Sequence, residues 1–332
     1  MPKQNEIAKT SFMTLLSDRR ALPYDEFINW ALYDPVIGYY TSTNNRVGKN
    51  SKSDFYTSSS LGSTWGNLVV DATCKLLGSQ DPKNFTFLEI GAEPENDSIG
   101  KVPHPFKEIK NIRLGDPFEI PSLAVVFSNE WLDAQPFKRF RFNNLSTQWE
   151  ELGVALEGEL WMEKILLESE SDLEITKQFP QNYSLPYIID WPTGAENSIR
   201  KLSRLNWSGL FLAFDYGLDV QRIFNDFPEG TARSYFNHQA TNNILQNPGL
   251  QDITCHVCWN PLQEIMSNHG FTQISIQRQE SFFVNTAQLA MQKMFTNQKE
   301  GEGNLGALKE LIHPQHLGHK FQALHAIRGI QQ

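Results

Sequence analysis

Short apolar runs that end in polar residues are the clearest pattern along the chain. They lie at 85–90 (FTFLEI), 122–127 (SLAVVF) and 209–214 (GLFLAF). Strands buried in a parallel sheet have this pattern, and their functional groups follow the carboxyl ends. A helical pattern instead covers the residues up to about Leu32 and those from about Thr64 to Leu77. The sequence therefore predicts a doubly wound α/β core.

Two insertions interrupt this core. Residues 137–163 alternate between apolar and polar side chains, which predicts antiparallel hairpins, and residues 221–250 are polar and rich in turn formers. After Pro261 the pattern predicts a helix, a strand at 271–278 and a terminal strand at 321–327. The predicted divisions are a helical N-terminal cap with a loop (1–63), the first part of the core (64–136), a β-rich insertion (137–200), a core strand (201–217), a second cap insertion (218–250) and the C-terminal part of the core (251–332).

Composition narrows the choice of partners. The 332 residues are 40% hydrophobic and carry a net charge of −9, so the chain can bury a large core, and nothing favours nucleic acid or an anionic membrane as a partner. Three cysteines are too few for a disulfide framework. The N-terminal residues MPKQNEIAKTSF lack the apolar run of a signal peptide, and no run approaches the roughly 18 apolar residues that span a bilayer. We expect a cytoplasmic protein without a membrane span.

Two groups of potential metal ligands do not have the pattern of a metal site. Cys255, His256 and Cys258 are close in sequence, but neighbouring residues of a strand point to opposite faces, and no second pair lies at zinc-like spacing. Histidines recur at every third residue from His313 to His319, but a proline and a glycine between them interrupt a helix. We therefore expect no bound metal.

The segment 85–97 (FTFLEIGAEPEND) begins like a cofactor-binding turn. An apolar strand that runs into Glu-Ile-Gly-Ala is how the first strand of an S-adenosylmethionine (SAM) methyltransferase ends, and glycines there let backbone N–H groups approach the ligand. Glu93 and Glu95 stand where further glycines are expected, with Pro94 between them. A side chain at these positions occupies space that the methionine part of SAM needs.

Eight segments of the chain resemble, in the same order, the MidA-type methyltransferases, whose mitochondrial member is a complex I assembly factor that methylates a protein arginine with SAM. The segments are Ala31–Tyr40, Ser53–Gly66, Leu88–Ala92, Ser128–Phe140, Phe214–Gly217, Gly230–His238, Asn247–Val257 and His313–Leu324. The resemblance implies a SAM-methyltransferase (Rossmann-like) sheet with cap insertions, SAM as the cofactor, and a protein as the substrate or partner.

The cofactor half departs from the family pattern. Only Glu93–Pro121 is available where two strands and their helices are expected, and one crossover with its helix needs at least about 10–12 residues. This length has room for one crossover and one strand, so we expect a sheet that is shortened on the cofactor side. Asp116, after the short apolar run 112–114, is the candidate for the acidic residue that holds the ribose hydroxyls.

The stretch that follows the second apolar run is the best candidate for chemistry. Asn129, Glu130 and Asp133 come after a buried strand, where a carboxylate can accept two N–H bonds from a guanidinium and direct its nitrogen toward a methyl sulfonium. The resemblance thus implies that Glu130 is an orienting anion and Asn129 a neutral positioning group. The alternative is that Ser128 and Asn129 cap a following helix.

Further positions complete the predicted site. The cofactor-binding candidates are Glu89, Gly91, Ala92 and Asp116, together with Asp54 and Thr57 of the loop 48–63, which could close over the ligand. The substrate-pocket candidates are Tyr40, Asp215, Tyr216, Asp252 and His256. An alternating strand would place Asp252, Thr254 and His256 on one face. The alternatives are a solvated serine-rich loop, a turn-forming Asp215 and an ordinary half-buried strand.

Two functions remain open from the sequence. The first is a SAM-dependent protein arginine N-methyltransferase with Glu130 orienting the guanidinium, and the matching segments support it. The second is a catalytically inactive protein-binding or assembly factor that retains the substrate-facing surface. Glu93, Glu95 and the short region before Pro121 support the second function, because they predict weakened or lost binding of SAM.

Overall fold

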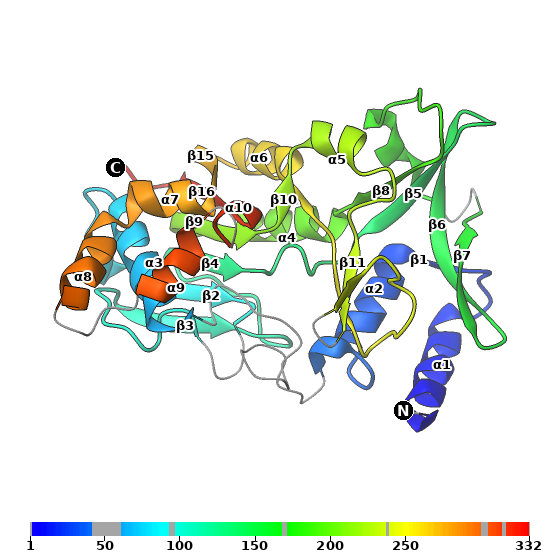
Figure 1. Cartoon of the computed structure of the whole chain (residues 1–332), viewed down its shortest axis with the longest axis horizontal. Helices are drawn as coiled ribbons and strands as arrows, with labels where there is room; N and C mark the ends of the chain where they lie inside the picture. Colours follow the sequence, from blue (N-terminus) through cyan, green and yellow to red (C-terminus); the bar gives the residue numbers. More distant parts are fainter. Residues whose placement is uncertain are drawn as a thin grey trace.

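A six-stranded mixed sheet forms one half of the molecule (Figure 1). The computed structural model describes residues 2–41, 61–92, 97–167, 171–236, 239–299, 305–313 and 317–331. The strand order is β15-β16-β9-β4-β2-β3; β3, β2, β4 and β9 are parallel, and β16 is antiparallel to both of its neighbours. The strands are β2 (Thr86–Ile90), β3 (Glu108–Ile112), β4 (Leu123–Asn129), β9 (Ser208–Asp215), β15 (Phe271–Arg278) and β16 (Gln322–Arg328). All five strands predicted from the apolar runs and the C-terminal pattern are confirmed.

Helices cover both faces of this sheet. One face carries α3 (Ser63–Leu76), α7 (Gln279–Thr286), α8 (Gln288–Lys299), α9 (Leu305–Ile312) and α10 (Leu317–Lys320), and the other carries α4 (Thr193–Arg204) and α6 (Trp259–Asn268). Val125 and Phe127 of β4 belong to the first core, whereas Ala124 and Val126 belong to the second. The apolar run of β4 is continuous because both of its faces are buried.

The segment between β2 and β4 is short. Between β2 and β4 the described residues form a single strand, β3, which lies at the edge of the sheet. The described residues of the two links, 91–107 and 113–122, contain no helix, so the expected crossover helix is not found there. A parallel pair needs only a chain long enough to return along the strand, and an irregular link of this length can do so without a helix.

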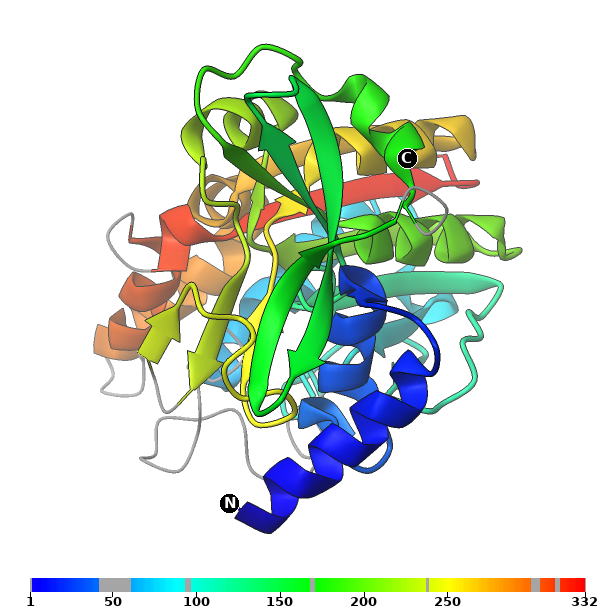
Figure 2. The same cartoon turned by 90° about the vertical axis from the view of Figure 1, so that its right-hand side faces the viewer.

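A second, antiparallel sheet forms the other half of the molecule and faces the viewer in Figure 2. Its strands are β1 (Leu22–Pro23), β5 (Lys138–Asn143), β6 (Gln148–Glu157), β7 (Leu160–Ile165) and β8 (Tyr187–Trp191). The hairpins predicted over 137–163 are confirmed, since β5 and β7 both pair antiparallel with β6. The helices α1 (Pro2–Leu16) and α2 (Tyr24–Tyr33) contribute to a hydrophobic core with this sheet. The helical pattern up to Leu32 is thus correct apart from the break at β1.

The remaining elements are short. They are η1 (Tyr39–Thr41), η3 (Pro82–Asn84), η5 (Leu173–Gln178), α5 (Val220–Asp226), β10 (Gly217–Leu218), β11 (Arg233–Phe236), β12 (Gln239–Thr241), β13 (Asp252–Thr254) and β14 (Val257–Cys258). The predicted strand through Asp252, Thr254 and His256 is wrong. β13 pairs with β11 and ends at Thr254, and β14 then pairs with β10 in another sheet, so the chain changes direction before His256. Within the described residues, none of the helices has both the length and the apolar composition that crossing a bilayer requires.

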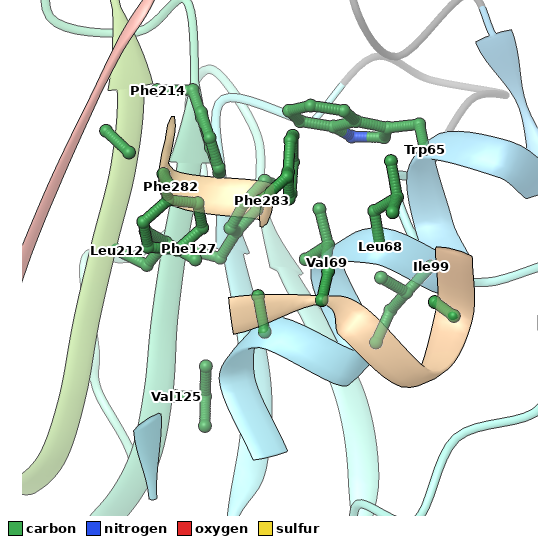
Figure 3. Close-up of a cluster of buried hydrophobic side chains, with 14 of the residues drawn as sticks. Trp65, Leu68, Val69, Ile99, Val125, Phe127, Leu212, Phe214, Phe282 and Phe283 are labelled. Carbon is green, nitrogen blue, oxygen red and sulfur yellow. The ribbon is translucent and has the colours of Figure 1, made fainter. Parts of the chain in front are cut away.

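An aromatic cluster fixes α3 and α7 on the sheet (Figure 3). The ring of Trp65 lies 4.9 Å from that of Phe214 and 5.5 Å from that of Phe283, both in edge-to-face geometry. Trp65 is fully buried, and among the described residues its indole N–H has no hydrogen-bond partner. The side chain therefore acts on stability through packing.

We expect Trp65→Ala to lower the free energy of unfolding by about 3–5 kcal/mol, because it removes a large buried ring and leaves a cavity. Trp65→Phe should cost less than about 2 kcal/mol, since most of the ring contacts remain and no hydrogen bond is lost. Urea denaturation measures both. Phe295→Ala, at a half-exposed ring of α8, is the control and should cost less than about 1 kcal/mol. Equal losses for the two Trp65 variants would contradict this account.

Candidate functional site

The carboxyl ends of β4 and β9 lie side by side and carry the predicted catalytic residues Asn129, Glu130 and Asp133 and two of the predicted substrate-pocket residues, Asp215 and Tyr216. The two strands pair in parallel with Asn129 opposite Phe214, so the residues that follow them meet at one edge of the sheet. The backbone N–H of Glu130 donates to the carbonyl of Phe214 at 2.9 Å and continues this pairing. The structure thus brings Asn129, Glu130 and Asp133 together with Asp215 and Tyr216.

The turn after β4 is irregular, and no helix follows it. Glu130 has a φ of 52°, in the left-handed region that side chains with a Cβ rarely adopt. The residues from Glu130 to the start of β5 form turns, all of them described, so the alternative of a helix capped by Ser128 and Asn129 is wrong. Backbone in such a sparsely populated region is found preferentially at functional sites.

Asp215 joins the chain after β4 to the chain after β9. One carboxylate oxygen accepts the backbone N–H of Leu132 at 2.8 Å, and the other accepts the N–H of Tyr216 at 3.0 Å. The side chain of Asp215 is fully buried, as is nearly all of Asp133 beside it. Asp215 is the last residue of β9 and the chain after it is not a turn; its carboxylate instead holds the turn that carries Glu130.

Side chains from the other half of the molecule complete the group. Asp252 of β13 is buried and accepts the hydroxyl of Tyr40 at 2.8 Å, and Tyr33 stacks on Tyr40 at 5.4 Å. Burial raises the pKa of the Tyr235 hydroxyl of β11, and Asp133 and Asp252 raise it further. We call Glu130, Asp133, Asp215 and Asp252 the acidic cluster. Tyr235 was not predicted, although it lies in the family-like segment 230–238, because nothing in that segment marks it as pointing to these carboxylates.

Burial and mutual repulsion shape the protonation of the acidic cluster. Burial raises the pKa of Asp133 well above its usual range, and the carboxylates of Asp215 and Asp252 raise it further. Burial raises the pKa of Asp215 to about 7, against the lowering effect of the Leu132 N–H. Burial also raises the pKa of Tyr216, and Glu130 adds to this effect. Additional negative charge is therefore disfavoured here, and a cation is favoured.

Three of the cofactor-binding candidates lie around the end of β2. Gly91 has a φ of +77°, which glycine adopts without strain, and its N–H donates to the carbonyl of Ile112 at 2.9 Å. The side chain of Trp131 packs against the face of Gly91 where a Cβ would lie, with Trp131 Cδ1 at 3.3 Å from that position. Ala92 is buried. The indole of Trp131 thus fills the space that a side chain at position 91 would need.

The acidic residues Glu89 and Asp116, which were predicted to bind the cofactor, accept hydrogen bonds from within the protein. Glu89 is buried and accepts the backbone N–H of Ser98 at 2.8 Å and its hydroxyl at 2.6 Å. Asp116 is exposed and accepts the N–H of Arg113 at 2.8 Å, which closes its own turn. Asp54 and Thr57, like Glu93, Pro94 and Glu95, lie outside the described residues.

These contacts test whether the described residues fit SAM. The N–H of Gly91 and the carboxylate of Glu89 are bonded within the chain, and Asp116 is turned to solvent. The described residues on this side therefore do not present the set of contacts by which such a fold holds SAM. The residues of the acidic cluster, in contrast, lie together.

His256 stands apart from the acidic cluster. Its Nδ1 lies 3.4 Å from the carbonyl of Thr231, and its ring is 6.5 Å from that of Tyr216. Burial lowers the pKa of His256, and Arg233 lowers it further. In the described part of the chain, no three His, Cys, Asp or Glu side chains form a group that could hold a metal ion.

The protonation of Glu89 in the native protein can be tested without a ligand. Burial raises the pKa of Glu89 to about 7, so between pH 4.5 and 7 the native state holds a proton that the unfolded state has lost. The free energy of unfolding should consequently fall as pH rises through this window. Glu89→Gln, which stays neutral and can still accept the Ser98 N–H, should match the wild type near pH 4.5 and exceed it by up to about 3 kcal/mol at pH 8.

Urea denaturation at several pH values measures this difference. Glu174→Gln, at an exposed residue of η5, controls for the removal of one negative charge and should give no such divergence. Parallel pH curves for the wild type and Glu89→Gln would show that Glu89 is ionised in the native protein.

Comparisons with known proteins agree with this architecture. A family profile described as "Putative S-adenosyl-L-methionine-dependent methyltransferase" matches residues 100–276, more than half of the chain, and the match begins after the Gly91 turn. No curated protein matches the chain.

Two solved structures share the fold. One is a crystal structure of a Burkholderia thailandensis protein described as a "likely methyl transferase", bound to S-adenosyl-homocysteine, with a TM-score of 0.81 and 18% identity. The other is a native crystal structure of an uncharacterized protein of the same superfamily and organism, with a TM-score of 0.80 and 18% identity. Each comparison covers 99% of this chain and 94% of the other. The chain therefore belongs to this family of SAM-dependent methyltransferases, and its resemblance to the MidA-type proteins is confirmed.

Proposed function

We propose that the acidic cluster binds an arginine side chain of a protein, and that this chain is a protein arginine N-methyltransferase with weakened binding of SAM. The observation that carries the proposal is the gathering of four carboxyl groups at the ends of β4, β9 and β13. Asp133, Asp215 and Asp252 are buried, whereas Glu130 is only half-buried. Glu130 is thus the carboxylate of the cluster that a ligand reaches most directly.

A guanidinium suits this arrangement. It is a planar cation whose N–H groups can pair with both oxygens of one carboxylate, and aromatic faces stabilise it further. Tyr216 and Tyr235 lie within electrostatic reach of Glu130 and supply such faces. Asn129 donates to Glu130 at 3.0 Å, and its own Oδ1 is buried without a hydrogen-bond partner among the described residues. This oxygen could accept a further N–H from the ligand.

The support for SAM comes from the fold. A protein of similar fold is bound to S-adenosyl-homocysteine, the product that SAM leaves after methyl transfer. In this chain the described residues around β2 differ from a cofactor-binding turn, because the N–H of Gly91 is bonded to Ile112 and Trp131 covers the glycine. We therefore expect SAM to bind weakly.

A second candidate function is a catalytically inactive protein that binds or assembles a partner through the same acidic cluster. The packing of Trp131 against Gly91 favours it, since the indole occupies space next to the turn that a cofactor would approach. The single strand, β3, that the described residues form between β2 and β4 supports this second function as well. Both candidates share the recognition of arginine and differ in the use of SAM.

Glu130→Gln tests the recognition of arginine. Titration calorimetry would compare a peptide with one central arginine with the same peptide carrying citrulline, which is neutral and nearly isosteric. We expect the wild type to prefer arginine by at least about 10-fold, and Glu130→Gln to lose most of that preference, because a hydrogen bond to a charged partner contributes about 1.5–3 kcal/mol. Glu174→Gln is the control and should bind as the wild type does.

Titration with SAM, followed by mass spectrometry of the arginine peptide, separates the two functions. Binding of SAM with a mass increase of one methyl group would support the methyltransferase, and arginine-dependent peptide binding without either result would support the inactive binder. Equal affinities of the wild type for the arginine and citrulline peptides would overturn both.

A further inference from the structure

Asp215 connects two segments that carry different parts of the site. Its two carboxylate oxygens accept N–H groups from Leu132, after β4, and from Tyr216, after β9. The two segments are far apart in sequence, and this carboxylate bonds to the backbone of each. Because a carboxylate accepts charge-assisted hydrogen bonds, this link is stronger than one made by a neutral side chain.

Hydrogen bonds to β9 hold the turn at Glu130, its strained residue, and again two residues later. Glu130 has a φ of 52°, its own N–H is held by the carbonyl of Phe214, and the N–H of Leu132, two residues later, is held by Asp215. The left-handed conformation of Glu130 is therefore fixed to β9 on both sides. A residue with a Cβ keeps such a conformation only when its surroundings determine it.

Asp215 cannot contact the ligand as Glu130 can. Its side chain is fully buried, and Asp133, whose pKa the Asp215 carboxylate raises, is nearly so. The titratable groups that face this pair from the adjoining elements include Glu130, Tyr216, Asp252, Tyr235, Tyr40 and Cys255. All are acids, so they favour a proton on this pair, whereas the N–H groups of Leu132 and Tyr216 favour the charged form of Asp215.

We propose that Asp215 is a positioning residue, which holds Glu130 in its left-handed conformation so that the Glu130 carboxylate is directed toward a guanidinium. This inference rests on the proposed recognition of arginine. It assigns Asp215 a role that acts through the backbone of the turn, and it explains why a buried carboxylate is placed behind an accessible one.

Asp215→Asn tests this role, because an amide keeps the shape of the side chain but offers only one acceptor oxygen to the two N–H groups. We expect the affinity for the arginine peptide to fall by at least about 10-fold. The matched control is Asp71→Asn, where a half-buried carboxylate of α3 accepts the N–H of Ala290 at 2.8 Å, and the affinity should not change.

A double-mutant cycle distinguishes positioning from general damage to the fold. In the Glu130→Gln background, Asp215→Asn should cause no further loss of affinity for the arginine peptide, because its effect passes through Glu130. Additive losses in the two backgrounds, or an unchanged affinity in a folded Asp215→Asn protein, would overturn the proposal.

Amide hydrogen exchange gives a readout that needs no ligand. The amides of Leu132 and Tyr216 should exchange at least about 10-fold faster in Asp215→Asn than in Asp71→Asn. Unchanged exchange would overturn the link even if arginine binds. Faster exchange in a protein that does not distinguish arginine from citrulline would confirm the link and overturn the proposed function instead.

Discussion

The parallel pairing of β4 with β9 is the constraint on which the candidate site depends. It places Asn129 opposite Phe214, so that the chain leaves both strands at the same edge of the sheet. A shift of this register by one residue would exchange the two faces of each strand and move the residues after them away from one another. Burial of both faces of β4 under helices excludes such a shift, because its side chains alternate between two separate cores. The geometry of the acidic cluster therefore follows from ordinary packing in the sheet.

The acidic cluster is costly for stability, which is an argument for function. Burying carboxyl groups next to one another raises their pKa values and concentrates negative charge where water cannot screen it. A core built only for stability would place apolar side chains at these positions. Arg139, a buried cation in the other half of the molecule, differs from the acidic cluster because opposite charges lie beside it. It is 3.4 Å from Asp190 and 3.6 Å from Glu163.

The sequence predicts the sheet well because its signals are local. The runs at 122–127 and 209–214 are apolar on both faces, and the predicted strand at 271–278 has the observed bounds of β15. Glu130, Asp133 and Asp215 could be found because they lie within a few residues of the ends of such runs. Tyr235 could not, because its position depends on the antiparallel pairing of β11 with β13, which is long-range and leaves no periodic pattern. The continuation of β13 to His256 failed for the same reason, since Val257 pairs with Gly217 in another sheet.

The site is assembled from parts of the chain that are distant in sequence. Tyr40 precedes the first strand of the large sheet, whereas Asp252 comes more than two hundred residues later, and their side chains are in contact. The C-terminal strand β16 then inserts between β9 and β15. A ribosome that has released only the first two hundred residues therefore carries a chain with Glu130 but without Asp215 or Asp252. The acidic cluster therefore cannot form until the segment that contains Asp252 has left the ribosome.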